Sequence, residues 1–248
     1  MMDWLFVFVL GLVTGSFLNA CIYRIPRGIS LITPPSRCPR CNNTLGAVDL
    51  VPVLSYLFLT GKCRRCRERI SPRYPLVELA CGTGFLILYF KFGPAPEYLA
   101  AITLFSGLVA ISLIDLEHGI IPDTINLTLV VAGVPLLLLQ SGHAVLNGLL
   151  GALLGGGLLL LAAVVSRGGM GGGDIKLAAV LGLYLGWVNV LLVLFVAFLI
   201  GAAAGLVWVW TKRKTMKQTL PFAPFLSVAT FIVLLWGGET IDWYRGLF

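Results

Sequence analysis

The sequence predicts an all-α polytopic membrane protein with about eight transmembrane helices and a small polar insertion between the first two. Three observations predict this class: the composition, the length of the apolar runs, and the distribution of Lys and Arg. Hydrophobic residues make up 58% of the 248 residues and charged residues 12%, whereas soluble domains carry roughly 45–50% apolar and about 25% charged residues. Such a chain has too few polar groups to cover a water-facing surface, so we expect lipid to be its main solvent.

The apolar runs have the length of membrane-spanning helices. A span needs about 20 apolar residues. Eight runs approach that length: 3–22, 76–92, 97–114, 121–140, 145–165, 174–187, 189–211 and 221–237. The run 174–187 is short, and whether it crosses fully stays open. The first run is not expected to be a signal peptide, because no basic region precedes it and no small-x-small cleavage site follows it.

The positions of Lys and Arg predict the orientation. With eight spans, the segments 23–75, 115–120, 166–173 and 212–220 share one side, and 16 of the 18 basic residues lie in or beside them. Basic residues favour cytoplasmic loops, so we expect this side to be the cytoplasmic face of the membrane, with both termini outside. The net charge of +7 therefore needs no nucleic-acid partner and instead favours anionic membrane lipids.

The chain divides into three parts by this pattern. Residues 1–23 form the first transmembrane helix, residues 24–75 a small cytoplasmic domain, and residues 76–248 the transmembrane body.

Four cysteines predict a zinc site in the cytoplasmic domain. They form two C-x-x-C pairs, Cys38 with Cys41 and Cys63 with Cys66, separated by 21 residues, close to the usual zinc-ribbon gap of about 15–20. Two disulfides or a redox pair are the alternatives, but structural disulfides are rare in the cytoplasm. Because protein fills all four ligand positions, we expect a structural Zn²⁺ that stabilises a domain too small to build much core.

Two aspartates at membrane depth predict the chemistry. Asp115 ends the third span and Asp174 opens the sixth, and both emerge on the cytoplasmic side. Ionisable groups in the membrane are costly and usually functional. If the helices bring the two carboxyls together, they share a proton: one activates water and the other donates to a scissile carbonyl oxygen. This pattern predicts an aspartic peptidase.

Four neighbouring residues are expected to support the catalytic loop. Gly171 and Gly173 precede Asp174 and allow close backbone approach, although a flexible turn between helices would use the same glycines. Lys176 follows in the same segment. Asp123 lies near the start of the fourth span, where it could instead be a helix cap.

The residues together resemble the bacterial type IV prepilin peptidases, the GxGD-type aspartic leader peptidases of type IV pilus and type II secretion systems. The resemblance covers nearly the whole length. Besides both C-x-x-C pairs and both aspartates, it rests on the segments Gly15-Ser16-Phe17-Leu18-Asn19, Arg73-Tyr74-Pro75-Leu76-Val77-Glu78, Gly171-Gly172-Gly173-Asp174 and Leu220-Pro221-Phe222-Ala223-Pro224-Phe225. Ala223 stands where the family usually has Gly.

The resemblance implies that Asp115 and Asp174 are the catalytic pair and that the substrates are prepilins or pseudopilins, cut after a glycine between a basic leader and an apolar helix. Family members with the tetracysteine loop are often bifunctional and methylate the new N-terminus from S-adenosylmethionine. Gly61, Lys62 and Glu78 match positions associated with that methyl transfer.

Two other classes of function fit part of the sequence. A divalent-metal transporter could use Asp115, Glu117, His118, Asp123 and Asp174 as ligands, although transporter sites usually lie near the membrane midplane in chains with internal repeats. A non-enzymatic assembly factor could use the zinc loop to bind partners, but it leaves the membrane-edge aspartates unexplained.

Overall fold

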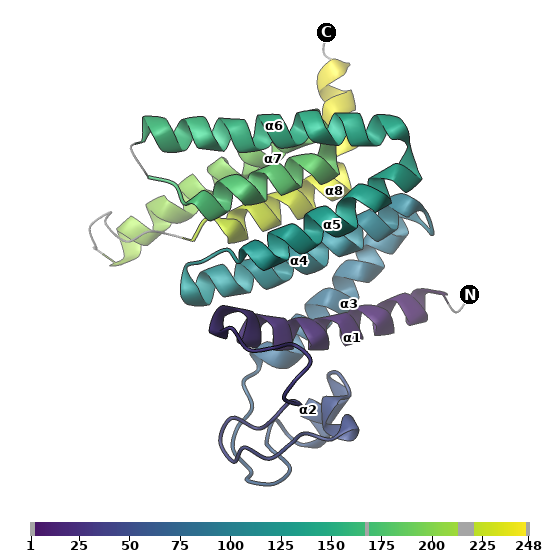
Figure 1. Ribbon diagram of the computed structural model, residues 1–248, viewed down its shortest axis with the longest axis vertical. Helices are drawn as coiled ribbons and strands as arrows, with labels where there is room; N and C mark the ends of the chain where they lie inside the picture. Colours follow the sequence, from purple (N-terminus) through teal and green to yellow (C-terminus); the bar gives the residue numbers. More distant parts are fainter. Residues whose placement is uncertain (1–2, 167–168, 213–220, 247–248) are drawn as a thin grey trace. The chain divides into compact units, whose positions relative to one another are not determined.

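The computed structural model describes residues 3–166, 169–212 and 221–246. The basic residues Arg167, Arg213, Lys214 and Lys217, and Leu220 of the last family segment, lie outside this part of the chain. Within it, seven helices are long and apolar enough to cross a membrane. They are α1 (Asp3–Arg24), α3 (Arg73–Phe92), α4 (Pro96–His118), α5 (Asp123–Gln140), α6 (Gly142–Val165), α7 (Gly172–Lys212) and α8 (Ala223–Arg245) (Figure 1). The predicted all-α membrane class is confirmed.

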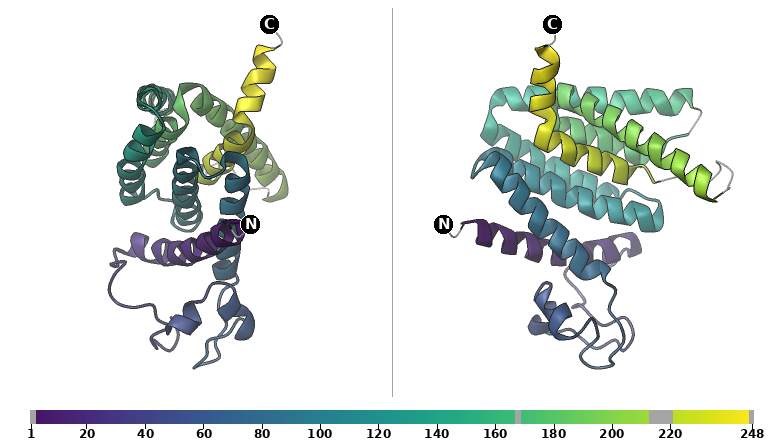
Figure 2. Two further views of the ribbon diagram at one scale, coloured as in Figure 1. Left: turned by 90° about the vertical axis from the view of Figure 1, so that its right-hand side faces the viewer. Right: turned by 180° about the vertical axis from the view of Figure 1, so that it is seen from behind.

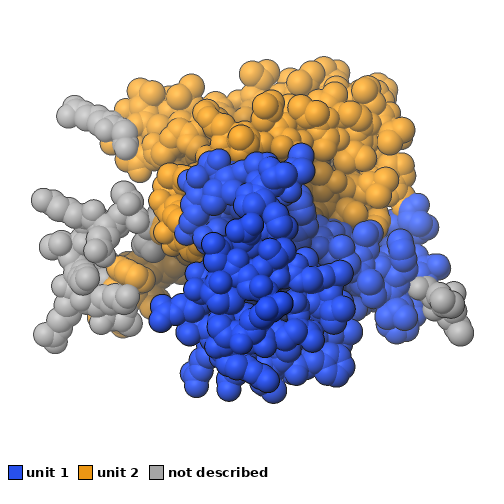
Figure 3. Space-filling view, turned by 60° about the horizontal axis from the view of Figure 1, so that its bottom comes forward, with its two compact units in different colours: residues 1–94 blue, residues 95–248 orange. Residues whose placement is uncertain are grey.

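The chain forms two compact units, residues 1–94 and residues 95–248 (Figure 3). In the first unit α1 packs against α3. Their backbones approach closely at Gly15, where a Cβ atom would lie 2.7 Å from the Cα atom of Glu78. Small residues permit such close packing between membrane helices. The division into parts at residues 23 and 75 stays a prediction.

The polar insertion between α1 and α3 contains little regular structure. A 3₁₀ turn, η1 (Ile25–Arg27), follows α1 directly, and a second, η2 (Ala47–Leu50), precedes the short helix α2 (Leu54–Phe58). The rest consists of turns and two isolated β-bridges, Arg37 with Thr44 and Lys62 with Arg69. Few apolar side chains of this part are buried, which explains why it needs another source of stability.

The second unit is a bundle of α4 to α8. α4 packs against both α5 and α8, and α7 packs against α6 and α8. The α4–α8 contact joins Phe105 and Phe231, with ring centroids 5.3 Å apart, and the hydroxyls of Ser112 and Ser227, 2.6 Å apart. This contact holds the C-terminal end of α4, where Asp115 lies, against the start of α8.

The chain direction reverses inside α7. Gly186 has φ 77° and ψ 174°, outside the helical region. A Cβ atom on Gly155 of α6 would contact Ala178 from the first half of α7 and Val190 from the second, at 2.6 and 2.9 Å. In a straight helix those two residues would lie about 18 Å apart, so the halves run back along each other, and both ends of α7 lie on one side of the bundle in Figures 1 and 2. The other six long helices and these two halves correspond to the eight predicted segments.

Candidate active site and metal centre

Asp115 is held at the end of α4 by the start of α8. The helix ends at Gly119, which adopts the left-handed conformation and donates its N–H to the Asp115 carbonyl at 2.8 Å. The Asp115 side chain is 7% exposed, and its Oδ2 accepts a hydrogen bond from the backbone N–H of Ala223 at 3.2 Å. The first N–H groups of a helix have no partner within the helix, so α8 offers this carboxyl both a donor and a positive helix end.

Asp174 lies in the first turn of α7 with one oxygen unused. Its Oδ1 is buried without a hydrogen-bond partner among the described residues, and its backbone N–H donates to Gly171. A Cβ atom on Gly171 would lie 3.1 Å from the Asp174 Oδ2. Leaving a buried polar atom unpaired is costly, so this oxygen is an acceptor available to a water molecule or a substrate.

The fold brings the two carboxyls close to each other. Although 59 residues separate them in the sequence, Asp115 acts electrostatically on Asp174. Two carboxylates at close range cannot both ionise without a large energetic cost, so a proton is readily shared between them. This interaction within the second unit supports the expected meeting of the two carboxyls, whose catalytic role stays a prediction.

Gly173 explains how the start of α7 reaches this position. A Cβ atom on Gly173 would lie 2.8 Å from the Cβ atom of Ile121, in the connection between α4 and α5, whereas one on Gly172 would meet open space. A larger residue at 173 would therefore push α7 away from the connection that follows Asp115. A side chain is therefore tolerated at position 172 but not at position 173.

Lys176 and Asp123 form an ion pair beside the aspartates. The Lys176 Nζ lies 2.8 Å from both carboxylate oxygens of Asp123 and joins the start of α7 to that of α5. Both side chains are largely exposed, at 58% and 67%, so the pair contributes about 0–1 kcal/mol at most. Because the ammonium group occupies both oxygens, Asp123 is a poor ligand for a divalent cation.

The four cysteines form a cluster that fits a metal ion. Their Sγ atoms all lie within 4.8 Å of one another, and this is the one metal-binding group found among the described residues. The Cys38 and Cys66 sulfurs are 3.8 Å apart. A tetrahedral zinc with Zn–S bonds of about 2.3 Å separates its sulfurs by about 3.8 Å, whereas a disulfide needs about 2.05 Å. The cysteines are free thiols, so the donor set fits a metal rather than two disulfides.

The two C-x-x-C pairs adopt the same turn. The N–H of Cys38 donates to the Asn43 carbonyl at 2.9 Å, and the Cys38 carbonyl accepts the N–H of Asn42 at 2.9 Å; the same two bonds recur 25 residues later around Cys63. Asn42 and Arg67 take equivalent left-handed positions, with φ 56° and 59°. This local repeat presents two sulfurs from each turn.

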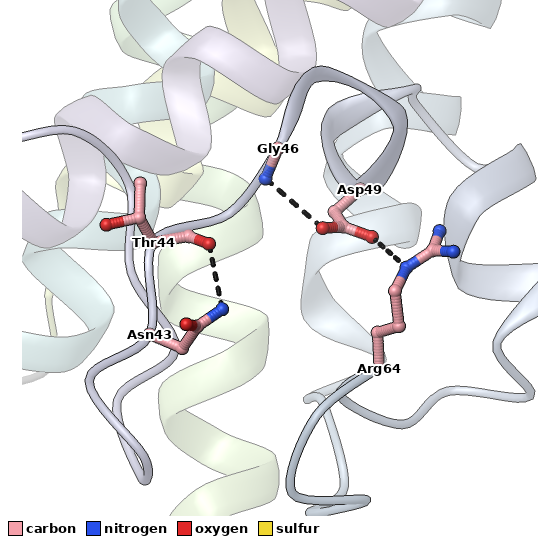
Figure 4. A network of polar contacts seen from close by, with 5 residues as sticks. All are labelled: Asn43, Thr44, Gly46, Asp49 and Arg64. Atoms are coloured by element: carbon pink, nitrogen blue, oxygen red, sulfur yellow. Dashed lines mark hydrogen bonds and ion pairs between the residues drawn. The ribbon is translucent and has the colours of Figure 1, made fainter.

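A polar clamp joins the second cysteine turn to η2, and the first turn has a local bond of its own. The Asp49 Oδ1 accepts the Arg64 Nε–H at 2.7 Å and the Asp49 Oδ2 accepts the Gly46 N–H at 3.1 Å, while the Asn43 amide donates to the Thr44 carbonyl (Figure 4). The hydrogen bond from Arg64 lowers the pKa of the Asp49 carboxyl. The clamp therefore persists as an ion pair at neutral pH.

The three residues associated with methyl transfer fall in two places within the first unit. Gly61 and Lys62 line a pocket of about 590 Å³, whose other lining residues are Tyr56, Thr60, Arg69, Ile70, Ser71 and Pro72. Gly61 needs its left-handed φ of 67°, and a Cβ atom there would lie 2.9 Å from the Tyr56 ring. Glu78 does not line this pocket; it is buried in α3, and its Oε2 accepts the Val53 N–H at 2.7 Å.

Several residues around the sites escape prediction from the sequence. The Ala223 N–H, the Ile121 contact and the Val53 bond involve main chain or apolar atoms, whose chemistry leaves no motif. Pro224, near the start of α8, is the one sequence signal for the helix start that presents the Ala223 N–H.

The fold and these sites define a polytopic helical membrane protein with paired aspartates and a tetracysteine insertion. Comparison with known proteins shows the same class. Residues 9–92 match the bacterial peptidase A24 N-terminal domain, and residues 102–206 match the type IV leader peptidase family. The chain belongs to this family of membrane enzymes.

Curated relatives cover nearly the whole chain. A protein of Burkholderia pseudomallei (strain 1026b) is 38% identical over 95% of this chain and 86% of its own length. One of Bacillus subtilis (strain 168) is 38% identical over 96% of each chain, and one of Aeromonas salmonicida (strain A449) is 34% identical over 98% of this chain and 95% of its own. Each is named prepilin leader peptidase/N-methyltransferase. No solved structure gives a significant match.

Proposed function

We propose that the protein is an aspartic endopeptidase that removes the basic leader of type IV prepilins or pseudopilins at the cytoplasmic face of a bacterial inner membrane. The observation that carries the proposal is the electrostatic pairing of Asp115 with Asp174, whose Oδ1 is buried and unpartnered. Whole-length similarity to relatives named prepilin leader peptidase/N-methyltransferase supports the substrate class.

The carboxyl pair performs hydrolysis with its own groups. The ionised carboxylate takes a proton from water as the water oxygen attacks the scissile carbonyl carbon, and the protonated carboxyl donates its proton to the carbonyl oxygen. When the tetrahedral intermediate collapses, the C–N bond breaks and the leaving amine takes a proton from the pair. The N–H of Ala223 fixes Asp115 during these transfers.

The orientation rests on the distribution of charge. Most basic residues flank the helix ends that carry the two aspartates and the cysteine insertion, and basic loops are retained in the cytoplasm. A leader whose basic segment stays on the cytoplasmic side would present its cleavage site at the depth of this carboxyl pair.

Two cofactors belong to the proposal. Zn²⁺ would be held by Cys38, Cys41, Cys63 and Cys66, where it would stabilise the insertion without entering the reaction. S-adenosylmethionine would supply a methyl group to the new N-terminal amine. The pocket beside Gly61 fits a small molecule by volume, and its Lys62 and Arg69 would hold the carboxylate end.

The direct test is the product mass from a purified prepilin-type substrate incubated with the protein in proteoliposomes. We expect loss of the leader after the glycine, and addition of one methyl group only when S-adenosylmethionine is present. Mild chelation with EDTA, at a level that leaves the cysteine-bound metal in place, should not stop cleavage. Loss of cleavage under that treatment would point to a catalytic metal, and metal flux into the vesicles without cleavage would favour the transporter.

A further inference from the structure

Six large apolar side chains close together in the sequence are exposed on the insertion. They lie within twelve residues, Ala47–Phe58, which comprise η2, a turn and α2. The most exposed of them are Phe58 at 84%, Val48 at 69% and Leu57 at 63%. Single exposed apolar residues are ordinary, but a contiguous group marks an interaction surface. We call this group, Val48, Leu50, Val51, Leu54, Leu57 and Phe58, the apolar segment.

A hydrogen bond joins the apolar segment to the membrane-spanning helix α3, close to the N-terminal end of that helix. The Val53 N–H donates to the Glu78 carboxylate at 2.7 Å, and Glu78 is the sixth residue of α3. At about 1.5 Å per residue, this bond lies about 8 Å along α3 from its first residue. The interfacial layer on each side of the hydrocarbon core is about 5–8 Å thick. The segment is therefore held beside the first two turns of α3, the end of the span where a membrane interface is expected.

A strained turn fixes the direction of the segment. Val53 has φ 60° and ψ −50°, and the Leu54 N–H donates to the Pro52 carbonyl, which is the rare γ-turn. A β-branched residue with positive φ persists only where its surroundings determine the backbone. The buried Glu78 carboxylate does this by binding the Val53 N–H, so α2 leaves the turn in a defined direction.

The net positive charge of the insertion complements an anionic lipid surface. Residues 24–73 contain ten Lys and Arg residues but only two acids, Asp49 and Glu68. Asp49 is already paired with Arg64. Each basic residue near an anionic membrane surface contributes about 1 kcal/mol of attraction, and an apolar patch beside basic side chains is typical of segments that lie in the interface.

We propose that Ala47–Phe58 lies in the headgroup layer of the membrane, with Leu57 and Phe58 among the acyl chains and the surrounding basic residues on anionic headgroups. This contact anchors the metal-binding insertion to the lipid surface instead of leaving it free in water. The proposal concerns lipid contact alone and stands or falls independently of the peptidase assignment.

The test is photo-crosslinking of the full-length protein in proteoliposomes of phosphatidylethanolamine and phosphatidylglycerol. A benzophenone amino acid replaces Phe58 in one variant and Leu57 in another. The matched control carries it at Glu68, whose side chain is 56% exposed on the second cysteine turn. The metal content of each purified variant checks that the insertion remains folded. If the Phe58 variant loses its metal, the lipid crosslinking of the Leu57 variant alone tests the proposal.

We expect lipid adducts by mass spectrometry to be several-fold more abundant at positions 57 and 58 than at position 68. Replacing phosphatidylglycerol with phosphatidylcholine should lower the yield at 57 and 58. Equal yields at all three positions would overturn the proposal. So would adducts at 57 and 58 that join peptides of this chain or a co-reconstituted prepilin, because a protein surface would then cover the apolar segment.

Discussion

At the scale of single residues, the proposed active site depends on what each aspartate is bonded to. Asp115 accepts the N–H of Ala223 and is thereby fixed, whereas Asp174 keeps one oxygen without a partner. The scarcity of acids in a lipid-soluble chain made both aspartates predictable from the sequence. The Ala223 bond was not predictable, because every residue except proline carries a backbone N–H.

Substitution of Gly173 tests whether its contact with Ile121 positions Asp174 for cleavage. We expect Gly173→Ala to lower the initial cleavage rate at least about tenfold, because its Cβ atom would meet Ile121 at 2.8 Å and small displacements of catalytic groups cost large factors in rate. Gly172→Ala is the matched control, since its Cβ atom would meet open space, and it should stay close to the wild-type rate. Equal rates for the two variants would show that the Ile121 contact does not position Asp174.

Lys62 separates the two proposed activities. We expect Lys62→Ala to remove methylation while leaving cleavage within about threefold of wild type, because the residue lines the pocket in the first unit and an exposed lysine stabilises a fold little. Arg65→Ala changes an exposed cation outside the pocket lining and should retain both activities. Full methylation by the Lys62 variant, measured from product masses, would remove Lys62 from the cofactor site.

At the scale of elements, hydropathy predicted which segments form helices long enough to cross the membrane, but it did not predict where those helices end. α8 was expected to stop at residue 237 but continues to Arg245 through Glu239 and Asp242. Helical hydrogen bonds form equally well beyond the apolar run, so hydropathy has no signal for the true end. The break in α7 was expected between residues 187 and 189 and occurs at Gly186, because glycine is nearly the only residue that adopts this conformation.

The reversal at Gly186 gives an element-level prediction. We expect Gly186→Ala to destabilise the protein by about 1–3 kcal/mol, because its backbone conformation is nearly exclusive to glycine and a Cβ atom would overlap the Asn147 side chain. Thermal unfolding in detergent measures the loss. Gly157→Ala in α6 meets open space and should be neutral or slightly stabilising. An undiminished unfolding temperature for the Gly186 variant would mean that the reversal tolerates a side chain.

The two cysteine turns give a second prediction at the scale of elements. We expect the combined Cys38→Ser and Cys41→Ser variant to lose its metal and to show faster backbone amide exchange across both turns, because a small domain folded around a metal loosens without it. Metal content by mass spectrometry and hydrogen exchange provide the two measurements. Cys21→Ala, in α1, should keep the metal. Retention of zinc by the serine variant would defeat the assignment.

At the scale of the whole molecule, the membrane made the fold class easy to predict and the pairing of helices hard. Lipid is a uniform apolar solvent, so composition and run length alone identify spans. Which helices pack together depends on side-chain shape, as in the contact of Gly155 with both halves of α7, and one sequence does not reveal such complementarity. The same holds for the candidate site. The sequence singled out Asp115 and Asp174, but only the fold shows that they interact electrostatically, and their catalytic role stays a prediction.

The most direct measurement is the cleavage rate of the Asp115→Asn and Asp174→Asn variants in proteoliposomes, with Glu97→Gln at the opposite end of α4 as the control. Because both carboxyls transfer protons in the transition state, we expect each Asn variant to lose a factor of about 10²–10⁴ or more while keeping its membrane insertion and metal. The Glu97 variant should match wild type. A near-wild-type rate from either Asn variant would contradict catalysis by this pair.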